Sequence, residues 1–157
     1  MLPIAYIAAP FAPNEGLSIP ENVANARALA KVAFSRGLAP LLVHHDVEQE
    51  VYGRDHVPED RVLGLAATRA LAALVGKHEG ELWMLLLPSG RMSTGCNGEW
   101  VAFNQAALAA RAAGTIRFFR LESGKPVEHV GFNPHACGGG SEERSETWKA
   151  ATREELA

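Results

Sequence analysis

The sequence predicts an α/β protein of one domain, in which a parallel sheet of four or five strands is flanked by helices. Short apolar runs alternate with longer segments of helical periodicity along residues 4–121. This order favours parallel strands joined by right-handed crossovers, with helices on both faces of the sheet. The apolar runs lack polar alternation, which is typical of strands buried on both faces. A length of 157 residues and a hydrophobic content of 47% allow one full core. We therefore expect a doubly wound, Rossmann- or flavodoxin-like sheet.

The first strand and the first helix come from residues 4–37. Residues 4–9 form an apolar run, and Pro10 ends it. Ser18, followed by Glu21 three residues later, is a helix-start signature. Gly37 is the stop signal of that helix.

The second strand and the second helix follow. Residues 38–43 are apolar and predict a strand. Pro58 suits the first turn of a helix, and the helical pattern runs on to about Gly76. A third strand is predicted over residues 81–87, where the side chains turn apolar again.

The last elements of the domain are a helix and one or two strands. An alanine-rich helical pattern runs from about Glu99 to Ala113. Gly114 ends it, and residues 115–121 predict a fourth strand. Residues 127–132 are a candidate fifth strand.

The end of the chain differs in composition from the rest. We expect an α/β domain over residues 1–134 and an appendage over residues 135–157. In the appendage, three consecutive glycines at residues 138–140 form a hinge, and residues 141–156 form a charged helix around Trp148. Such a helix is too polar for a core of its own, so it packs on a neighbouring subunit or stays mobile.

Charge and composition exclude several classes of function. The net charge of −3 gives no electrostatic reason to expect a nucleic-acid polymer as partner. No apolar run reaches transmembrane length, so we expect no membrane association. The first residues lack the basic region of a signal peptide. Two cysteines, Cys96 and Cys137, suit a reducing compartment, and we expect a cytoplasmic protein.

The candidate site is the segment between the third strand and the following helix, residues 88–99. It contains glycines, hydroxyl side chains and one carboxylate at the carboxyl end of a predicted strand, where open α/β sheets bind ligands. Glu99 would be kept ionised by the helix dipole and is a candidate nucleophile. Backbone amides there would hold a phosphate or a hydroxyl group. We expect the substrate to be bound by residues of this segment and of the ends of the first two strands, namely Arg91, Ser93, Thr94 and Gly95, together with Pro10, His45 and Asp46.

A structural interpretation of the same segment stays open, in which Ser93 or Thr94 caps the helix and Glu99 is a favourable acid in its first turn. A P-loop ATPase is excluded. Gly90 and Gly95 have the spacing of its outer glycines, but residues 96–97 are Cys-Asn where the ATPase needs Lys-Ser or Lys-Thr.

Other candidate residues lie at the ends of the first two strands. Tyr6 is either a core residue or a site residue. His44, His45 and Asp46 end the second strand, and only one of two adjacent histidines can face the crevice. A hydrogen bond from His45 to a substrate is favoured over a metal site, because no spacing of metal ligands accompanies it. The cluster over residues 54–61 contains two arginines, and which of them could meet an anionic substrate stays open.

Three segments together resemble the nucleoside 2-deoxyribosyltransferase family, which includes deoxynucleoside 5′-monophosphate N-glycosidases. Residues 4–10, Ile-Ala-Tyr-Ile-Ala-Ala-Pro, resemble its opening strand, Y-[IL]-A-x-P, with Tyr6 and Pro10 at the matching positions. Residues 81–83 resemble the strand before its site. Residues 93–99 resemble its S-x-G-x-x-x-E signature, through the residues Ser93, Gly95 and Glu99. The likeness spans roughly residues 3–121.

The resemblance implies an activity. The family's glutamate, matched by Glu99, attacks the anomeric carbon of a deoxyribose and releases the base. The first-strand tyrosine, matched by Tyr6, holds the carboxylate or the sugar, and Ser93 would contact a 5′-phosphate. The implied partner is a small nucleoside or nucleotide, without a cofactor, and the implied assembly is a homodimer or a larger homo-oligomer.

The chain departs from the family in one helix. The family has an aspartate on the helix before the third strand, whereas residues 65–74 contain no acid; Asp46, Asp55 or Asp60 could replace it. Hydrolysis is favoured over transfer, because a phosphate site belongs to the hydrolytic branch. Two alternatives are a nucleotide-binding sensor without turnover and a phosphoribohydrolase of the cytokinin-activating type.

Overall fold

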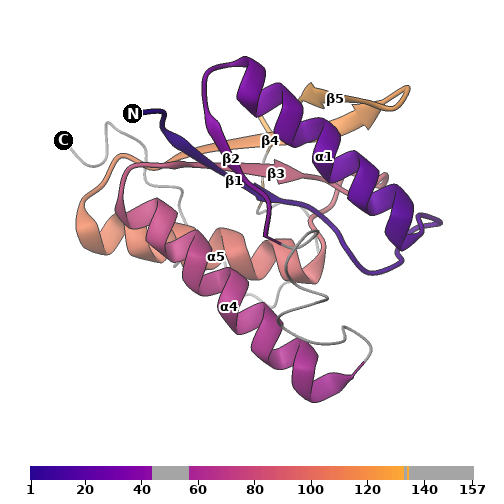
Figure 1. Ribbon diagram of the computed structural model, residues 1–157, viewed down its shortest axis with the longest axis horizontal. Coiled ribbons are helices and arrows are strands. Elements are labelled where there is room, and N and C mark those ends of the chain that lie inside the picture. The colour runs from indigo at the N-terminus through magenta and orange to yellow at the C-terminus, as the bar shows by residue number, and fades with distance from the viewer. Residues whose placement is uncertain (44–56, 133, 135–157) are drawn as a thin grey trace.

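The computed structural model describes residues 1–43, 57–132 and 134 (Figure 1). Its main elements, in chain order, are β1 (Ile4–Ala8), α1 (Ile19–Ser35), β2 (Ala39–Leu41), α4 (Pro58–Lys77), β3 (Glu81–Leu85), α5 (Thr94–Ala110), β4 (Thr115–Glu122) and β5 (Lys125–Glu128). The predicted appendage of residues 135–157 lies outside the described residues. No helix among the described residues is long and apolar enough to span a membrane.

The strands form one mixed sheet in the order β2-β1-β3-β4-β5. The pairs β1–β2, β1–β3 and β3–β4 are parallel, whereas β5 runs antiparallel to β4. The expectation of an all-parallel sheet is therefore wrong for the last strand. Ser123 and Gly124 connect β4 to β5 and both have positive φ, 50° and 74°. A two-residue turn of this kind reverses the chain, while a parallel pair needs a long crossover.

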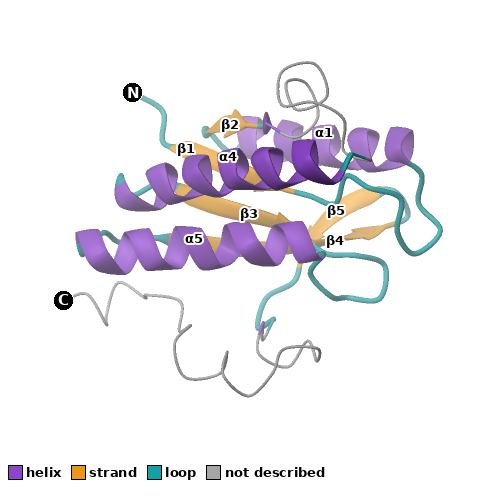
Figure 2. Cartoon of the chain, turned by 90° about the horizontal axis from the view of Figure 1, so that it is seen from below, coloured by secondary structure: helices purple, strands orange, loops and turns teal. Residues whose placement is uncertain are grey.

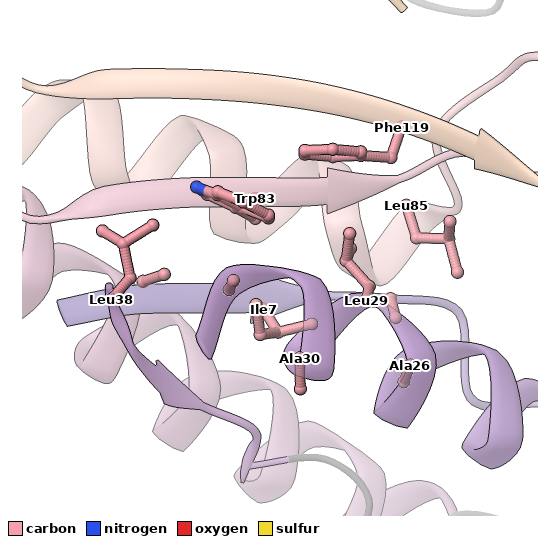
Figure 3. Close-up of a cluster of buried hydrophobic side chains, with 11 residues drawn as sticks. Ile7, Ala26, Leu29, Ala30, Leu38, Trp83, Leu85 and Phe119 are labelled. Atoms are coloured by element: carbon pink, nitrogen blue, oxygen red, sulfur yellow. The ribbon is translucent and has the colours of Figure 1, made fainter. Parts of the chain in front are cut away.

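Helices cover both faces of the sheet. Helix α1 lies above the sheet in Figure 1 and helices α4 and α5 lie below it; Figure 2 shows these two side by side in front of the strands. Successive side chains of β1 point to opposite faces of the sheet, so this strand contributes residues to the core on each face. Ile7 packs into the cluster under α1, and Tyr6 packs into the cluster under α4 and α5. In the α1 cluster, Trp83 stacks on Phe119 with ring centroids 4.6 Å apart (Figure 3).

Local signals in the sequence place most boundaries. The capping box at the start of α1 is confirmed, because the Ser18 hydroxyl accepts from the Glu21 backbone N–H and the Glu21 carboxylate accepts from the Ser18 backbone N–H. Helix α4 begins at Pro58 as predicted. The predicted start of the next helix near Glu99 is wrong, because α5 begins at Thr94. The N-cap is Ser93, so the last glycines of the segment lie inside the helix.

Candidate functional site

The centre of the candidate site is a buried hydrogen bond between Tyr6 on β1 and Glu99 on α5. The Tyr6 hydroxyl donates to Glu99 Oε1 at 3.0 Å. Both side chains are 0% exposed. The sheet brings them together because the carboxyl ends of the neighbouring strands β1 and β3 lie at one edge, and α5 starts from the segment that follows β3. The two residues predicted to be catalytic therefore contact each other.

Tyr6 also lies near the backbone of α4. Its hydroxyl is 3.2 Å from the carbonyl oxygen of Thr68, a longer contact than the one to Glu99. The pKa of Tyr6 is raised far above its usual value of 10.0 by burial, then by the negative charge of Glu99 and the hydrogen bond to it. The phenol thus keeps its proton at neutral pH. Its role in the pair is that of a donor which orients the carboxylate.

Helix α5 places Glu99 in its second turn. Ser93 is the N-cap, and its hydroxyl accepts from the Cys96 backbone N–H at 3.3 Å. The first turn contains no acid, so the interpretation of Glu99 as a first-turn acid is wrong. The helix dipole acts mainly within the first turn, and its effect on Glu99 is correspondingly smaller than expected.

Cys96 lies one turn before Glu99 and is 1% exposed. Burial raises the pKa of its thiol well above the usual value of 9.0, and the nearby Glu99 charge raises it further. The thiolate is the reactive form of cysteine. Cys96 is therefore an uncharged residue in the wall of the site, and it does not compete with Glu99 as a nucleophile.

A pocket of about 90 Å³ opens next to this pair. It lies between the segment after β1, the start of α4 and the start of α5. Four of the residues predicted to bind substrate are brought together in its wall: Pro10, Ser93, Thr94 and Gly95. The other lining residues are Ala9, Phe11, Ala12, Asn14, Arg61, Leu65 and Cys96. Cys96 lines the pocket, whereas Glu99 and Tyr6 are absent from its surface.

Arg61 is the arginine of the pocket. It comes from the first turn of α4 and lies across from the N-terminus of α5. In the sequence it is one member of a charged cluster, and nothing there separates it from its neighbours. Arg61 is brought into the pocket wall by the packing of α4 against α5.

Arg91 lies in a different contact from the one expected. Its guanidinium forms an ion pair with Glu15 at 3.3 Å, and it is absent from the pocket wall. The Glu15 carboxylate also accepts from the hydroxyl and the backbone N–H of Ser89. These two hydrogen bonds, followed by the one from Arg91, hold the pKa of Glu15 below its usual range. The cluster ties the segment after β1 to the segment after β3.

The remaining site candidates are not placed. His45 and Asp46 lie outside the described residues, as does the polar segment around them. In the described ranges no group of three or more potential metal ligands gathers. Thr68 is a fully buried residue of α4 whose carbonyl oxygen faces Tyr6, and no local signal in the sequence distinguishes it.

Comparison with known proteins adds a family without an assigned activity. Residues 3–112 match the family described as a domain of unknown function, DUF7768. The chain belongs to this family. The DUF7768 region begins just before β1 and ends just after α5, so it contains Tyr6, the pocket and Glu99 but neither β4 nor β5. No curated protein and no solved structure matches the chain.

Proposed function

We propose that the protein cleaves the N-glycosidic bond of a nucleoside 5′-monophosphate, with Glu99 as the nucleophile. One observation carries the proposal: a buried carboxylate that accepts a hydrogen bond from a tyrosine lies one helical turn from Cys96, which lines a pocket at the carboxyl end of β1. Ligands of open α/β sheets bind in this place. The resemblance to nucleoside 2-deoxyribosyltransferases supports the same assignment.

The chemistry follows a two-step displacement. A Glu99 oxygen forms an ester bond with the anomeric carbon, the C–N bond breaks, and the base leaves with the electron pair and takes up a proton from water. Water then attacks the sugar ester and releases free Glu99. A covalent intermediate divides one difficult displacement into two easier steps. Tyr6, protonated throughout, holds Oε1 in place while the charge on Glu99 changes.

The phosphate group would bind at the start of α5. The backbone N–H groups of a helix start attract an anion, and Arg61 supplies a positive charge on the opposite wall. Ser93 and Thr94 line the same wall. This recognition favours hydrolysis of nucleotides over transfer between free nucleosides. Small-molecule pockets span about 300 Å³ or more, so the base of a bound nucleotide would extend beyond this one.

Substrate must also reach Glu99. The carboxylate is 0% exposed, and Cys96 lies in the pocket wall one turn before it. The proposal therefore requires the wall around Cys96 to move when the sugar binds.

The burial of Glu99 favours a second candidate function: a nucleotide-binding module without turnover. In this case the pocket binds a phosphate and Glu99 acts only as a buried partner of Tyr6. The two functions differ in whether free base is formed.

Base release from a panel of ribo- and deoxyribonucleosides and their 5′-monophosphates tests both candidates. We expect the wild-type protein to release base from at least one monophosphate, and Glu99→Gln to lower the rate by about 10³-fold or more, because a neutral amide is a far weaker nucleophile. Chromatography of the products measures the rate. Circular dichroism of the variant checks that it is folded.

The outcomes separate the candidates. Equal rates for Glu99→Gln and the wild type would overturn the role of Glu99. Nucleotide binding measured by calorimetry without any free base would establish the binding module instead. Preference for ribonucleotides would favour the phosphoribohydrolase alternative.

A further inference from the structure

Helix α4 has an apolar stripe on the face opposite its core contacts. Val62 and Leu63 are each 67% exposed and Leu74 is 54% exposed. Ala66 and Ala70, between them, are also exposed. The buried residues of this helix, on its other side, are Gly64, Thr68, Ala72, Val75 and Gly76. Large exposed apolar residues grouped on one face indicate an interaction surface rather than scattered surface residues.

The stripe is bounded by an acidic residue at one end and by a basic residue at the other. Glu59 precedes it and Lys77 follows it, and both are exposed. The two are 18 residues apart, which is five full turns of an α-helix or about 27 Å, so they lie on the same line along α4. Ala66 and Ala70 lie within about 20° of that line. From the N-terminal to the C-terminal end of α4, the stripe therefore has an acidic residue, large apolar residues, two alanines, a large apolar residue and a basic residue.

We propose that α4 is the interface of a homodimer in which it packs antiparallel against α4 of a second copy of this chain. A two-fold axis near the middle of the helix would bring Glu59 to Lys77 of the second copy, and Lys77 to Glu59 of that copy. The same symmetry pairs Val62 with Leu74 and Ala66 with Ala70. One patch then complements itself in charge and in size, as a two-fold interface requires.

The size pattern fits a close crossing of two helices. The alanines lie near the axis, where the helices would approach most closely, and the larger Val62, Leu63 and Leu74 lie towards the ends. A parallel arrangement would set Glu59 against Glu59 and Lys77 against Lys77, so the charges select the antiparallel one. Arg61 lies on another side of the helix, in the pocket wall, and stays accessible in this dimer.

A charge-swap cycle on the full chain tests the proposal. Sedimentation velocity over a range of protein concentrations would give the dimer dissociation constant. Each single variant, Glu59→Lys or Lys77→Glu, creates two like-charge contacts per dimer, and we expect it to weaken the dimer about tenfold or more. The double variant restores both contacts with exchanged signs. We expect its dissociation constant to return to near the wild-type value.

Two further variants complete the design. Lys31→Glu on α1 reverses a charge on an exposed residue outside the stripe, and we expect it to leave the dissociation constant unchanged. Ala70→Glu places a charge at the crossing and should give a monomer, with circular dichroism confirming that the chain is folded. A wild-type chain that is monomeric at every concentration would overturn the proposal. Single variants that dimerise like the wild type, or a double variant no better than the singles, would overturn it equally.

Discussion

At the scale of single residues, the unusual feature is a carboxylate in an apolar core. Glu99 belongs to the fully buried residues, and the cluster around it contains Tyr6, Cys96, Trp100 and Phe103. Taking a charged group out of water is costly, and proteins keep such groups mainly where function or a specific contact requires them. The hydrogen bond from Tyr6 lowers that cost and sets the direction of the carboxylate. This combination is the residue-level basis of the proposed activity.

The arginine in the pocket gives a prediction at the same scale. We expect Arg61→Gln to raise KM for nucleoside 5′-monophosphates about 10- to 100-fold and to leave rates with unphosphorylated nucleosides unchanged, because only the phosphate meets the guanidinium. Steady-state kinetics with matched pairs of nucleoside and nucleotide measure the effect. Arg69→Gln, two turns further along α4 and absent from the pocket wall, is the control. Equal losses for both substrates would contradict the role of Arg61.

At the scale of the elements, helices α4 and α5 approach each other closely because glycine lies at their contact. A Cβ added to Gly76 on α4 would lie 2.5 Å from the backbone carbonyl oxygen of Phe103 on α5. A Cβ on Gly98 would meet the guanidinium of Arg69, which is flexible and can move. At Gly76 the neighbouring atom belongs to the backbone of α5, which cannot move aside as a flexible side chain can. The spacing of the two helices, and with it the wall of the site, therefore depends on Gly76.

A matched pair of glycine substitutions tests this contact. We expect Gly76→Ala to lower the free energy of unfolding by about 1–3 kcal/mol, because the helices must separate to admit a methyl group. Gly95→Ala lies in α5, where the new Cβ would be at an ordinary 3.5 Å from Leu65. It should be neutral or stabilise by up to about 1 kcal/mol, through the helix propensity of alanine. Urea unfolding measures both. A neutral Gly76→Ala would contradict the close approach.

At the scale of the whole molecule, a charged network ties α1 to the far edge of the sheet. Glu128 on β5 accepts from Arg117 on β4 at 2.9 Å and from Arg36, the C-cap of α1, at 3.1 Å. The Arg36 guanidinium also lies 5.2 Å from the centroid of Trp83. Burial alone would raise the pKa of Glu128, but the two arginines outweigh it and hold the pKa below its usual value of 4.5. The network joins elements that lie on both sides of the DUF7768 boundary.

The lowered pKa gives a pH-dependent prediction. A carboxyl group whose pKa is lower in the folded state stabilises the fold above its usual pKa and loses that contribution as the pH falls through the folded value. Glu128→Gln should therefore be less stable than the wild type at pH 7, by about 1 kcal/mol or less because the pair is partly exposed. The difference should shrink below about pH 4.5. Urea unfolding from pH 7 to pH 3 measures it.

The control for this prediction is Glu122→Gln. Glu122 also pairs with an arginine, Arg120 at 2.8 Å, but both side chains are half exposed. We expect almost no change in stability at any of these pH values. A difference between Glu128→Gln and the wild type that grows as the pH falls would contradict the assignment.

The sequence by itself determined the local structure of this protein. Hydrophobic runs and helical periodicity place the strands and helices, and capping residues such as Ser18 and Pro58 set where two helices begin. These signals act between residues a few positions apart, so they can be recognised without the fold. The predicted end of the third strand also pointed to the segment that contains Glu99, whereas Tyr6 became a catalytic candidate through the resemblance of residues 4–10 to the opening strand of the transferase family.

Only the tertiary structure decided which side chains meet. Tyr6 and Glu99 are 93 residues apart and come together because β1 and β3 are neighbours in the sheet. The packing of the elements also places Arg61 in the pocket wall and pairs Arg91 with Glu15. Which of these two arginines lies at the pocket could not be predicted from the sequence. The direction of β5 follows from a two-residue turn whose positive φ angles at Ser123 and Gly124 only the structure shows. Contacts of this kind depend on the relative position of whole elements, and local sequence carries no information on that position.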